Sequence, residues 1–295
     1  ADAELEPSLF GTLRMVELSQ LALRDLERHL GEVLGGKPIP VLLGVPEPRP
    51  GFDVDDAREL AEQLTPDEAE QRYRVETIPT GHAAALRAVE HAAERIRSGA
   101  SELCIAGGVD SYLDPDTLEW LDGERRLARE GVRSGFPPGE AAAMLLLASP
   151  RARARLGLPA LARVRGAAST QEARALDSET GSLGEGLSAA VRQATRSLSA
   201  GELVSDLYGD LNGERHRSED WGFTALRCAH VLRDASQVHT AVGECGDVGA
   251  ATGALHCVLA ARAWQREYAQ GARALLWAGS WSGARSVLLL EEGRA

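Results

Sequence analysis

Apolar residues along this chain occur either in short unbroken runs or in longer stretches with helical spacing. The run Ala141–Leu147 is continuous, as in a strand that is buried on both faces. The stretch Ala83–Ser98 instead carries apolar residues three and four positions apart, which predicts an amphipathic helix. Such strands and helices alternate along the sequence, and this order predicts an α/β fold with helices covering both faces of its sheets.

The same patterns place the remaining elements. Asp114-Pro115 predicts the start of a short helix, because aspartate caps a helix and proline favours its first turn. The other expected helices are Phe10–Leu30, Asp53–Leu64, Gly184–Leu198, Trp221–Leu232 and Gly249–Trp264. The other expected strands are Ile39–Val45, Tyr73–Ile78, Leu103–Gly108, Ala160–Gly166, Leu203–Tyr208, Val238–Val242, Ala274–Gly279 and Ser286–Leu290.

The order of elements is nearly the same in residues 1–150 and residues 151–295. We therefore predict two similar halves that arose by internal duplication. The second half has one more expected strand than the first. The strand without a counterpart is the one that would precede the helix Phe10–Leu30. We expect this N-terminal strand to be absent from the sequence.

Composition and charge exclude several functions. The 295 residues can bury one large core or two smaller ones, and 44% of them are hydrophobic. The formal net charge of -12 argues against a nucleic-acid partner, because phosphate binding needs a basic face. No apolar run approaches the roughly 20 residues of a membrane span, and no signal-peptide pattern opens the chain. We expect a cytoplasmic protein that binds neither membrane nor nucleic acid.

The cysteines and histidines predict no metal site and no cofactor. Cys104, Cys228, Cys245 and Cys257 form no C-x-x-C pair, so we interpret them as buried, reduced thiols. The seven histidines lack the spacing of zinc ligands.

The strongest candidate for chemistry is the turn Thr80-Gly81-His82. It lies between an expected strand and an expected helix, where a tight turn presents a residue at the positive end of the helix dipole. Folds often place a nucleophile or an anion site there. The surrounding sequence is typical of a reactive cysteine, yet the residue is His82.

Several motifs in order resemble β-ketoacyl synthases. Thr80–Ala88 is similar to their T-A-C-x-S-G-x-x-A turn, and Ile96–Asp110 to their helix–strand unit I-R-x-G … A-G-G. Phe136–Ala143 resembles G-x-x-x-G-E-G-A, Gly246–Gly253 resembles G-H-x-x-A-A-x-G, and Gly279–Gly283 resembles the C-terminal S-F-G-F-G-G hairpin. The resemblance spans nearly the whole chain. It implies a thiolase-like fold of duplicated βαβαβαββ halves in a five-layer α-β-α-β-α sandwich.

The resemblance also implies that the condensing site is lost. The family forms an acyl thioester on cysteine and stabilises an enolate with two histidines. Here the cysteine position is His82, and the histidine positions are Asn212 and Asp247. The nearby lysine position is Val242. An ionised Asp247 would repel an enolate, so we expect a His82–Asp247 ion pair capped by Asn212 in place of a condensing site.

The remaining site assignments also come from the resemblance. It implies substrate-binding positions at Gly246, Gly249, Ser280, Ser282 and Gly283. The strand Tyr73–Ile78 would lie at a two-fold interface, in a homodimer or in a heterodimer with a related chain.

Two further phrases resemble one bacterial subgroup of the family. Gly107–Leu121 and Asp210–Arg217 are similar to members that look equally degenerate, and some of these members are encoded beside type VI secretion components. This likeness implies an adaptor role in a secretion-linked locus. A carrier protein, an acyl-CoA or a secretion component would then be the partner.

Three functions therefore remain open. The first is a non-condensing binding or scaffold protein. The second is an acyltransferase or thioester hydrolase that uses His82, with Asn212 as the oxyanion donor. The third is a partner subunit like the chain-length factors of synthase heterodimers. A redirected Cys245 nucleophile is a weaker alternative, because we expect it at a strand end without a helix dipole.

Two charged segments have simpler interpretations. We expect Glu214–Arg217 to be a solvated loop, although its position also permits a role in binding. We expect Asp110, Asp114, Asp116 and Glu119 to lie at helix starts and on the surface, since they lack the pattern of a calcium loop.

Overall fold

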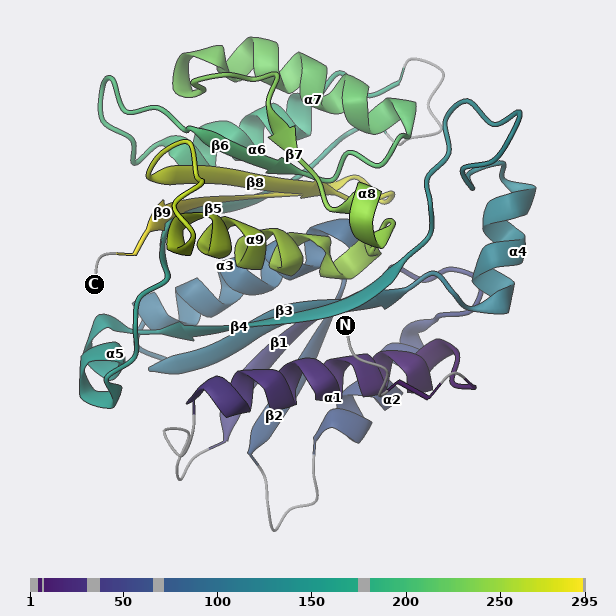
Figure 1. Ribbon diagram of the computed structural model, residues 1–295, viewed down its shortest axis with the longest axis horizontal. Coiled ribbons are helices and arrows are strands. Elements are labelled where there is room, and N and C mark those ends of the chain that lie inside the picture. Colours follow the sequence, from purple (N-terminus) through teal and green to yellow (C-terminus); the bar gives the residue numbers. More distant parts are fainter. Residues whose placement is uncertain (1–4, 7, 31–37, 66–71, 175–180, 294–295) are drawn as a thin grey trace.

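Two mixed β-sheets and three layers of helices make up the molecule (Figure 1). The computed structural model describes residues 5–6, 8–30, 38–65, 72–174 and 181–293. Helices lie below the first sheet, between the two sheets and above the second sheet, which gives the expected five layers. The expected thiolase-like α/β fold is therefore confirmed.

The first sheet has the strand order β2-β1-β3-β4. Strand β1 pairs in parallel with β2 and β3, and β4 pairs with β3 in antiparallel fashion. Its strands are β1 (Ile39–Val45), β2 (Tyr73–Pro79), β3 (Leu103–Ser111) and β4 (Glu140–Ala148).

The second sheet has the order β5-β9-β8-β6-β7. Strands β8 and β6 pair in parallel, as do β6 and β7, whereas β9 is antiparallel to both of its neighbours. Its strands are β5 (Ala162–Gln171), β6 (Asp206–Gly209), β7 (Val238–His239), β8 (Arg273–Gly279) and β9 (Ala284–Glu292).

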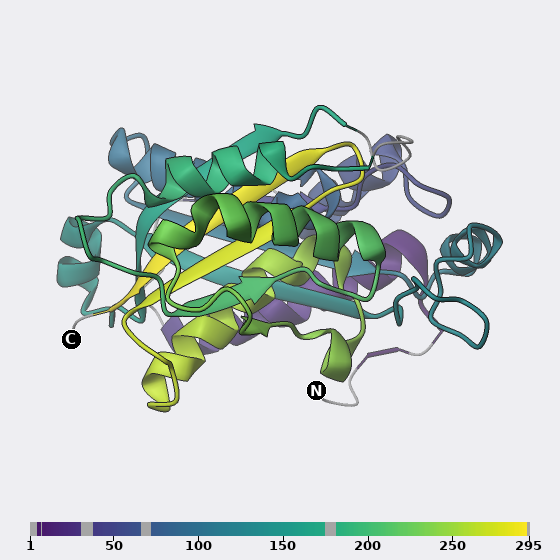
Figure 2. The same ribbon diagram turned by 90° about the horizontal axis from the view of Figure 1, so that it is seen from above.

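Each helical layer has a main pair of helices. Helices α1 (Gly11–Leu30) and α2 (Val54–Leu64) cover the outer face of the first sheet. Helices α3 (Ala84–Arg97) and α9 (Thr252–Gln265) fill the space between the sheets. Viewed from above, α6 (Glu185–Thr195) and α7 (Arg215–Cys228) lie side by side on the second sheet (Figure 2).

Shorter helical segments connect the layers. They are α4 (Pro115–Gly123), α5 (Pro150–Leu156), α8 (Val242–Cys245) and the 3₁₀ turns η3 (Gly81–Ala83), η4 (Ala229–Val231) and η5 (Gly249–Ala251).

Small residues allow the central helices to approach the first sheet closely. A Cβ added to Gly44 of β1 would lie 2.6 Å from the backbone nitrogen of Ala85 in α3. A Cβ added to Gly108 of β3 would lie 2.2 Å from the carbonyl oxygen of Ala250. Both distances are shorter than atomic contact permits, so glycine is needed where these layers meet. This contact places the start of α3 against the carboxyl end of β1, on the face of the first sheet that is turned toward the second sheet.

Several expected elements have different bounds in the structure. Strand β5 is Ala162–Gln171 rather than Ala160–Gly166, and β6 begins at Asp206 rather than Leu203. Strand β7 ends at His239, because the residues that follow leave the sheet and form α8.

The largest difference concerns the start of α7. The apolar pattern predicts a start at Trp221, but the helix begins at Arg215 and ends at Cys228. Arg217 and Asp220 lie in the first turns of the helix, and both side chains face inward and are buried. Helical periodicity was invisible there because charged residues, not apolar ones, form the inner face.

The described strands of the first sheet lack a counterpart to β5, in agreement with the strand count expected from the sequence. Met144–Leu147 of β4 and Val287–Leu290 of β9 hold equivalent places in their sheets. Strand β9 lies between β8 and β5, and its four residues are buried. In the described residues β4 pairs only with β3, and Leu145–Leu147 are partly exposed.

Hydrogen exchange should reveal this difference between the two strands. We expect alternate amides of β4 to exchange faster than those of β9, on the order of tenfold or more, because an edge strand leaves half of its amides without a partner. Exchange measured by mass spectrometry on the 295-residue chain would test this. Equal protection of Met144–Leu147 and Val287–Leu290 would contradict it.

Candidate functional site

The turn between β2 and α3 is fastened to the C-terminal hairpin. Gly81 adopts a φ of +58°, in the left-handed region that favours glycine. The Ser280 hydroxyl accepts a hydrogen bond from the backbone nitrogen of Ala83 at 2.9 Å and donates one to the carbonyl oxygen of Thr80. These bonds hold His82 at the turn, where its side chain is buried.

A glutamate closes the other side of this hairpin. The Glu47 carboxylate accepts hydrogen bonds from the backbone nitrogens of Trp281 at 3.0 Å and Ser282 at 3.1 Å. It also lies against Gly81, where an added Cβ would be 3.0 Å from Glu47 Oε2. The amides of the hairpin are therefore already paired with an anion. Sequence analysis missed Glu47, because it lies in a proline-rich loop without a recognisable motif.

His82, Asn212 and Asp247, which the motifs assign to the family triad, meet in the interior. His82 Nε2 lies 2.9 Å and 3.0 Å from the two carboxylate oxygens of Asp247. Asn212 Nδ2 donates to Asp247 Oδ2 at 2.6 Å, and the backbone nitrogen of Gly249 donates to Asp247 Oδ1 at 2.8 Å. The carboxylate is therefore surrounded by donors. This arrangement is the His82–Asp247 pair with an Asn212 cap that the substituted motifs suggest.

Electrostatics hold the Asp247 carboxylate in its ionised form. Burial alone would raise the pKa of Asp247, but the charge and hydrogen bond of His82 outweigh it, with further help from Arg217 and Asn212. The net effect holds the pKa of Asp247 well below its usual range. His82 Nε2 faces this carboxylate at 2.9 Å, so the nitrogen is engaged in an internal contact.

Arg217 is the central cation of the site. Its Nη1 donates to Asp210 and to the carbonyl oxygen of Gly279 at 3.0 Å, and its Nε donates to Glu214 at 3.3 Å. Its Nη2 lies 3.1 Å from His82 Nε2. Burial alone would lower the pKa of Arg217, but the surrounding carboxylates raise it.

The interpretation of Glu214–Arg217 as a solvated loop is wrong. Glu214 and Arg217 are buried, whereas Arg215 is exposed and His216 is partly covered. The Glu214 carboxylate accepts hydrogen bonds from Asn212, Arg126 and Arg217. The segment is the N-cap and first turn of α7, and its two buried charged residues, Glu214 and Arg217, are three positions apart on one face of the helix. Sequence alone offered no signal, because a dense charge run is usually solvated.

A second buried ion pair lies beside the first. Arg49 Nη2 lies 2.6 Å from Asp110 Oδ1, and the Arg49 guanidinium lies over the Tyr112 ring at 4.3 Å from its centroid. Asp110 Oδ2 accepts a hydrogen bond from the backbone nitrogen of Ala250 at 2.8 Å. The expectation that Asp110 lies on the surface is therefore wrong, because Arg49 compensates its charge in the interior. Asp114, by contrast, caps α4 as expected.

Basic and acidic side chains meet in this group of residues, which we call the buried ionic cluster. Its acids are Asp110, Asp210, Glu214 and Asp247, and their basic partners are Arg49, Arg126, Arg217 and the imidazole of His82. Three guanidinium groups and one imidazole thus face four carboxyl groups. Buried charges are tolerated only when each has partners, so the members depend on one another.

Residues 124–139, which we call the strap, run across the cluster between α4 and β4. The backbone nitrogen of Asp247 donates to the carbonyl oxygen of Pro137 at 2.7 Å, and the nitrogen of Gly139 donates to the carbonyl oxygen of Asp247 at 2.9 Å. Arg126 Nε donates to Glu214 at 2.7 Å, and its guanidinium lies 3.1 Å from the centroid of the Trp281 ring. The strap thereby closes the cluster from outside.

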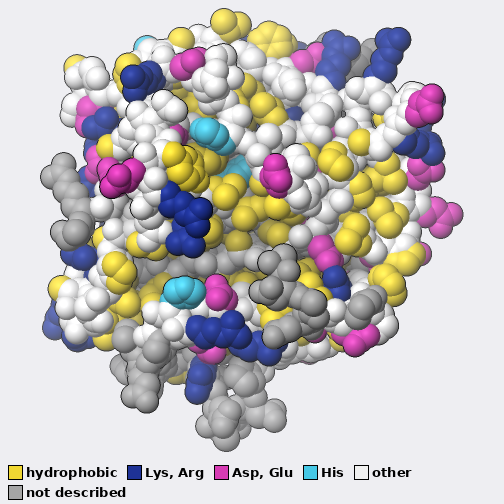
Figure 3. Space-filling model, in the orientation of Figure 1, with side chains coloured by type: hydrophobic (Ala, Val, Ile, Leu, Met, Phe, Trp, Pro, Cys, Tyr) yellow, Lys and Arg dark blue, Asp and Glu magenta, His cyan; other side chains and the backbone are white. Residues whose placement is uncertain are grey.

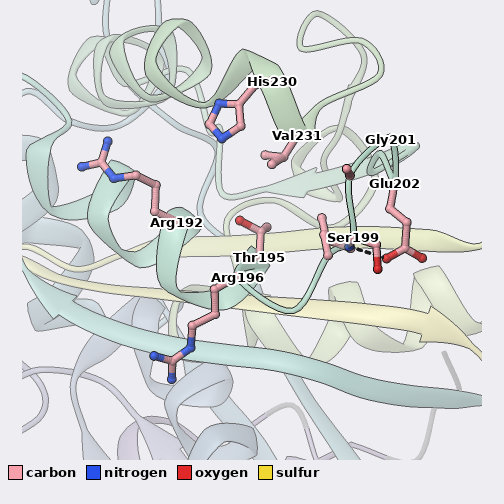
Figure 4. Close-up of a pocket in the computed structure, with 10 residues that line it drawn as sticks. Arg192, Thr195, Arg196, Ser199, Gly201, Glu202, His230 and Val231 are labelled. Atoms are coloured by element: carbon pink, nitrogen blue, oxygen red, sulfur yellow. Dashed lines mark hydrogen bonds between the residues drawn. The ribbon is translucent and has the colours of Figure 1, made fainter.

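The remaining space at the cluster is small. A cavity of about 10 Å³ borders Asp210, Arg217 and Ser280, which is about the volume that one water molecule needs. A larger cavity of about 310 Å³ lies elsewhere, between the end of α6 and η4. Figure 4 shows that Arg192 and Arg196 at its wall point away from each other.

The five predicted substrate-binding positions have structural tasks here. A Cβ on Gly246 would lie 2.7 Å from the carbonyl oxygen of Pro138, and one on Gly249 would lie 1.9 Å from Asp110 Oδ2. Both glycines therefore permit close packing of the strap and the cluster. Ser280 and Ser282 bind the turn and Glu47, and Gly283 has a φ of +94° in the hairpin. Substrate binding at these positions stays a prediction.

The cysteines differ from expectation at one position. Cys104, Cys228 and Cys257 are buried, and burial raises the pKa of each thiol. Cys245 is exposed on α8 rather than buried at a strand end. It is thus held outside the buried ionic cluster, because α8 turns away from the sheet.

Other kinds of site were also sought. In the described part of the chain, no three His, Cys, Asp or Glu side chains are grouped as a metal site would require. None of the described helices is both long and apolar enough to cross a membrane.

Removing Arg217 should show how strongly the cluster depends on it. Arg217→Ala removes the cationic partner of the buried Asp210 and leaves Glu214 with Arg126, and we expect it to lower the free energy of unfolding by about 3–5 kcal/mol. The adjacent, exposed Arg215 is a matched control, and Arg215→Ala should cost about 0.5 kcal/mol or less. Urea unfolding of both variants measures this, and similar losses would contradict the role given to Arg217.

His256 of α9 should contribute to the acid sensitivity of the fold. Both of its ring nitrogens lack a hydrogen-bond partner among the described residues, and its ring centroid lies 6.0 Å from that of Tyr208. Burial lowers the pKa of His256 from 6.5 to about 4. The unfolded chain therefore binds a proton that the folded chain refuses, and stability falls as the pH drops from about 6.5 to about 4.

The variant His256→Leu should flatten this part of the pH dependence of the unfolding free energy. Part of the slope should remain, because burial also lowers the pKa of His216 to about 4. The exposed His230 gives the control His230→Leu, which should leave the slope unchanged. Chemical unfolding between pH 4 and pH 7 tests this, and an unaltered slope in His256→Leu would refute it.

Comparison with known proteins agrees with this geometry. Residues 74–152 match the family model "Beta-ketoacyl synthase, N-terminal domain". No curated protein matches the chain in sequence. Among solved structures, the ketosynthase from module 6 of the bacillaene synthase of Bacillus subtilis 168 is similar with a TM-score of 0.81 and 14% identity. That match covers 96% of this chain and 59% of the ketosynthase, so this chain spans less than two thirds of its length.

Two further structures contain complexes. The ishigamide ketosynthase/chain length factor matches with a TM-score of 0.76 and 18% identity, over 95% of this chain and 82% of that one. A type II polyketide synthase ketosynthase bound to its acyl-carrier protein, AntDE:AntF, matches with a TM-score of 0.74 and 16% identity, over 98% and 86%. At these identities the likeness establishes the fold. The chain thus has the thiolase-like fold of ketosynthases, and residues 74–152 match the N-terminal domain of the β-ketoacyl synthase family.

Proposed function

We propose that this protein is a non-condensing relative of the ketosynthases that acts as a binding or scaffold subunit. The observation that carries the proposal is the contact of His82 Nε2 with both oxygens of Asp247, at 2.9 Å and 3.0 Å. The residue at the acyl-accepting position is committed to an internal ion pair. The role of His82 is therefore structural.

The surroundings of this pair also oppose condensation. Decarboxylative condensation needs a nucleophile and donors for a developing negative charge. The nucleophile position holds His82, whose Nε2 contacts Asp247, and the ionised Asp247 occupies the place of an enolate-stabilising histidine. A carboxylate there repels an enolate and a malonyl carboxylate alike.

Acyl transfer through His82 gains no support either. Such a reaction needs a free imidazole nitrogen and a free oxyanion donor. Asn212 could serve as that donor, but its Nδ2 already donates to Asp247 and Glu214, and its Oδ1 accepts from the backbone nitrogen of Glu214. Its hydrogen-bonding capacity is spent within the cluster.

The scaffold function includes pairing with a related chain. Strand β2 ends the first sheet and pairs only with β1 among the described strands, which leaves its outer edge for a two-fold contact. The similar ishigamide structure is a ketosynthase/chain length factor complex. A homodimer or a heterodimer with an active synthase would both fit this edge. An adaptor role in a secretion assembly is another form of the same scaffold function.

Activity measurements on the purified protein test the proposal. We expect carbon dioxide release from malonyl-carrier protein to equal that of heat-denatured protein, because no group stabilises the enolate. We also expect no acyl adduct by intact-mass spectrometry after incubation with acyl-CoA. Turnover or an acyl adduct would contradict the proposal if it is lost in the variant His82→Ala and persists in the control variant His230→Ala.

A designed variant sharpens the test. His82→Cys restores only the nucleophile, and Asp247 still faces it. We expect this variant to remain inactive in condensation. Activity in His82→Cys would mean that the rest of the site is intact, and the scaffold proposal would then lose its main support.

A further inference from the structure

An exposed apolar surface lies at the end of the molecule that carries α4. Four large apolar side chains form what we call the apolar patch, and each exposes two fifths or more of its surface. They are Phe10 with 54% exposed, Leu13 with 49%, Val54 with 64% and Leu113 with 40%. They come from the start of α1, the start of α2 and the loop ahead of α4.

These three segments are fixed against one another. Thr12 of α1 donates a hydrogen bond to Asp56 of α2 at 2.7 Å. Thr117 of α4 donates to the carbonyl oxygen of Pro50, just ahead of α2, at 2.7 Å. A Cβ added to Gly51 would lie 2.2 Å from Asp114 Oδ1, so these segments touch. The patch is therefore preorganised rather than formed by a loose loop.

Acidic residues border the patch. Glu6, Asp53, Asp55 and Asp116 are exposed and lie beside its members in the same three segments. Figure 3 shows hydrophobic side chains gathered on the right side of the molecule, with acidic side chains along their outer border.

Nearby cations only partly compensate this border. The side chain of Arg14 is paired with Glu140, and that of Arg49 is paired with Asp110 inside the molecule. Arg58 is the exposed cation beside Asp55, at 2.9 Å. One exposed arginine therefore faces four exposed carboxylates, and the border carries a net negative charge.

We propose that the apolar patch with its acidic border docks a basic amphipathic helix of a partner protein. The apolar side chains of such a helix would cover the patch, and its lysines or arginines would face the acidic border. A second copy of this surface, an acidic carrier protein or an anionic lipid surface would instead meet like charge. Charge thus selects one kind of occupant for an exposed apolar area.

A synthetic peptide can probe this surface on the 295-residue protein. The probe is a fluorescently labelled helical peptide with leucines along one face and lysines elsewhere, and its counterpart carries glutamates in place of the lysines. We expect the lysine peptide to bind in anisotropy titrations, more weakly as salt rises, and the glutamate peptide not to bind.

Paired variants decide whether the binding belongs to the patch. Val54→Ser with Leu113→Ser should weaken binding about tenfold or more, since each loses buried apolar area. Asp55→Asn with Asp116→Asn should weaken it and reduce its salt dependence. The control Leu226→Ser, on α7 with 80% of its side chain exposed, should bind like the parent chain. Circular dichroism melts check that each variant remains folded.

Three outcomes would overturn the proposal. These are no binding of the lysine peptide, equal binding of the glutamate peptide, and binding that the patch variants leave unchanged. Light scattering measures the oligomeric state of the same variants. A dimer that is lost in the Val54 and Leu113 variants would also overturn the proposal, because it would assign the patch to a second copy of the chain.

Discussion

The need to neutralise Arg217 in the interior shapes the rest of the candidate site. A guanidinium without water requires carboxylates within hydrogen-bond reach, and this one has Asp210 and Glu214 as direct partners. Those carboxylates require further donors, which Asn212 and Arg126 supply. One buried charge thus determines the orientation of side chains from α7, the strap and the ends of two strands.

The same network joins the two halves of the chain. Asp247 of the second half binds His82 of the first through its side chain, and it binds the strap through its backbone. Glu47 and Ser280 fasten the turn at Gly81 to the C-terminal hairpin from opposite directions. Such buried polar contacts add little net stability when complete, but they are costly to break and specify one arrangement.

The buried ionic cluster also keeps the interior of the candidate site filled. Gly81 adopts a left-handed backbone conformation at the turn, and the next residue, His82, lies against Asp247. An emptied site would leave the polar groups of the cluster without partners.

Sequence by itself determined the architecture and the identity of the central pair. Continuous apolar runs and helical spacing specify buried strands and covering helices, since burial depends on residue type and period. Ordered motifs assign His82, Asn212 and Asp247 to one site. The strand count also showed that the first sheet would have one strand fewer than the second.

Only the tertiary structure decided which charges are buried. Arg217 and Glu214 look like a solvated run in the sequence, and Asp110, Arg49 and Glu47 carry no motif. Each becomes an interior residue because a distant segment brings the opposite charge or a set of backbone amides to it. Hydrophobic periodicity cannot reveal such residues, since their burial follows from partners that are far away in the chain.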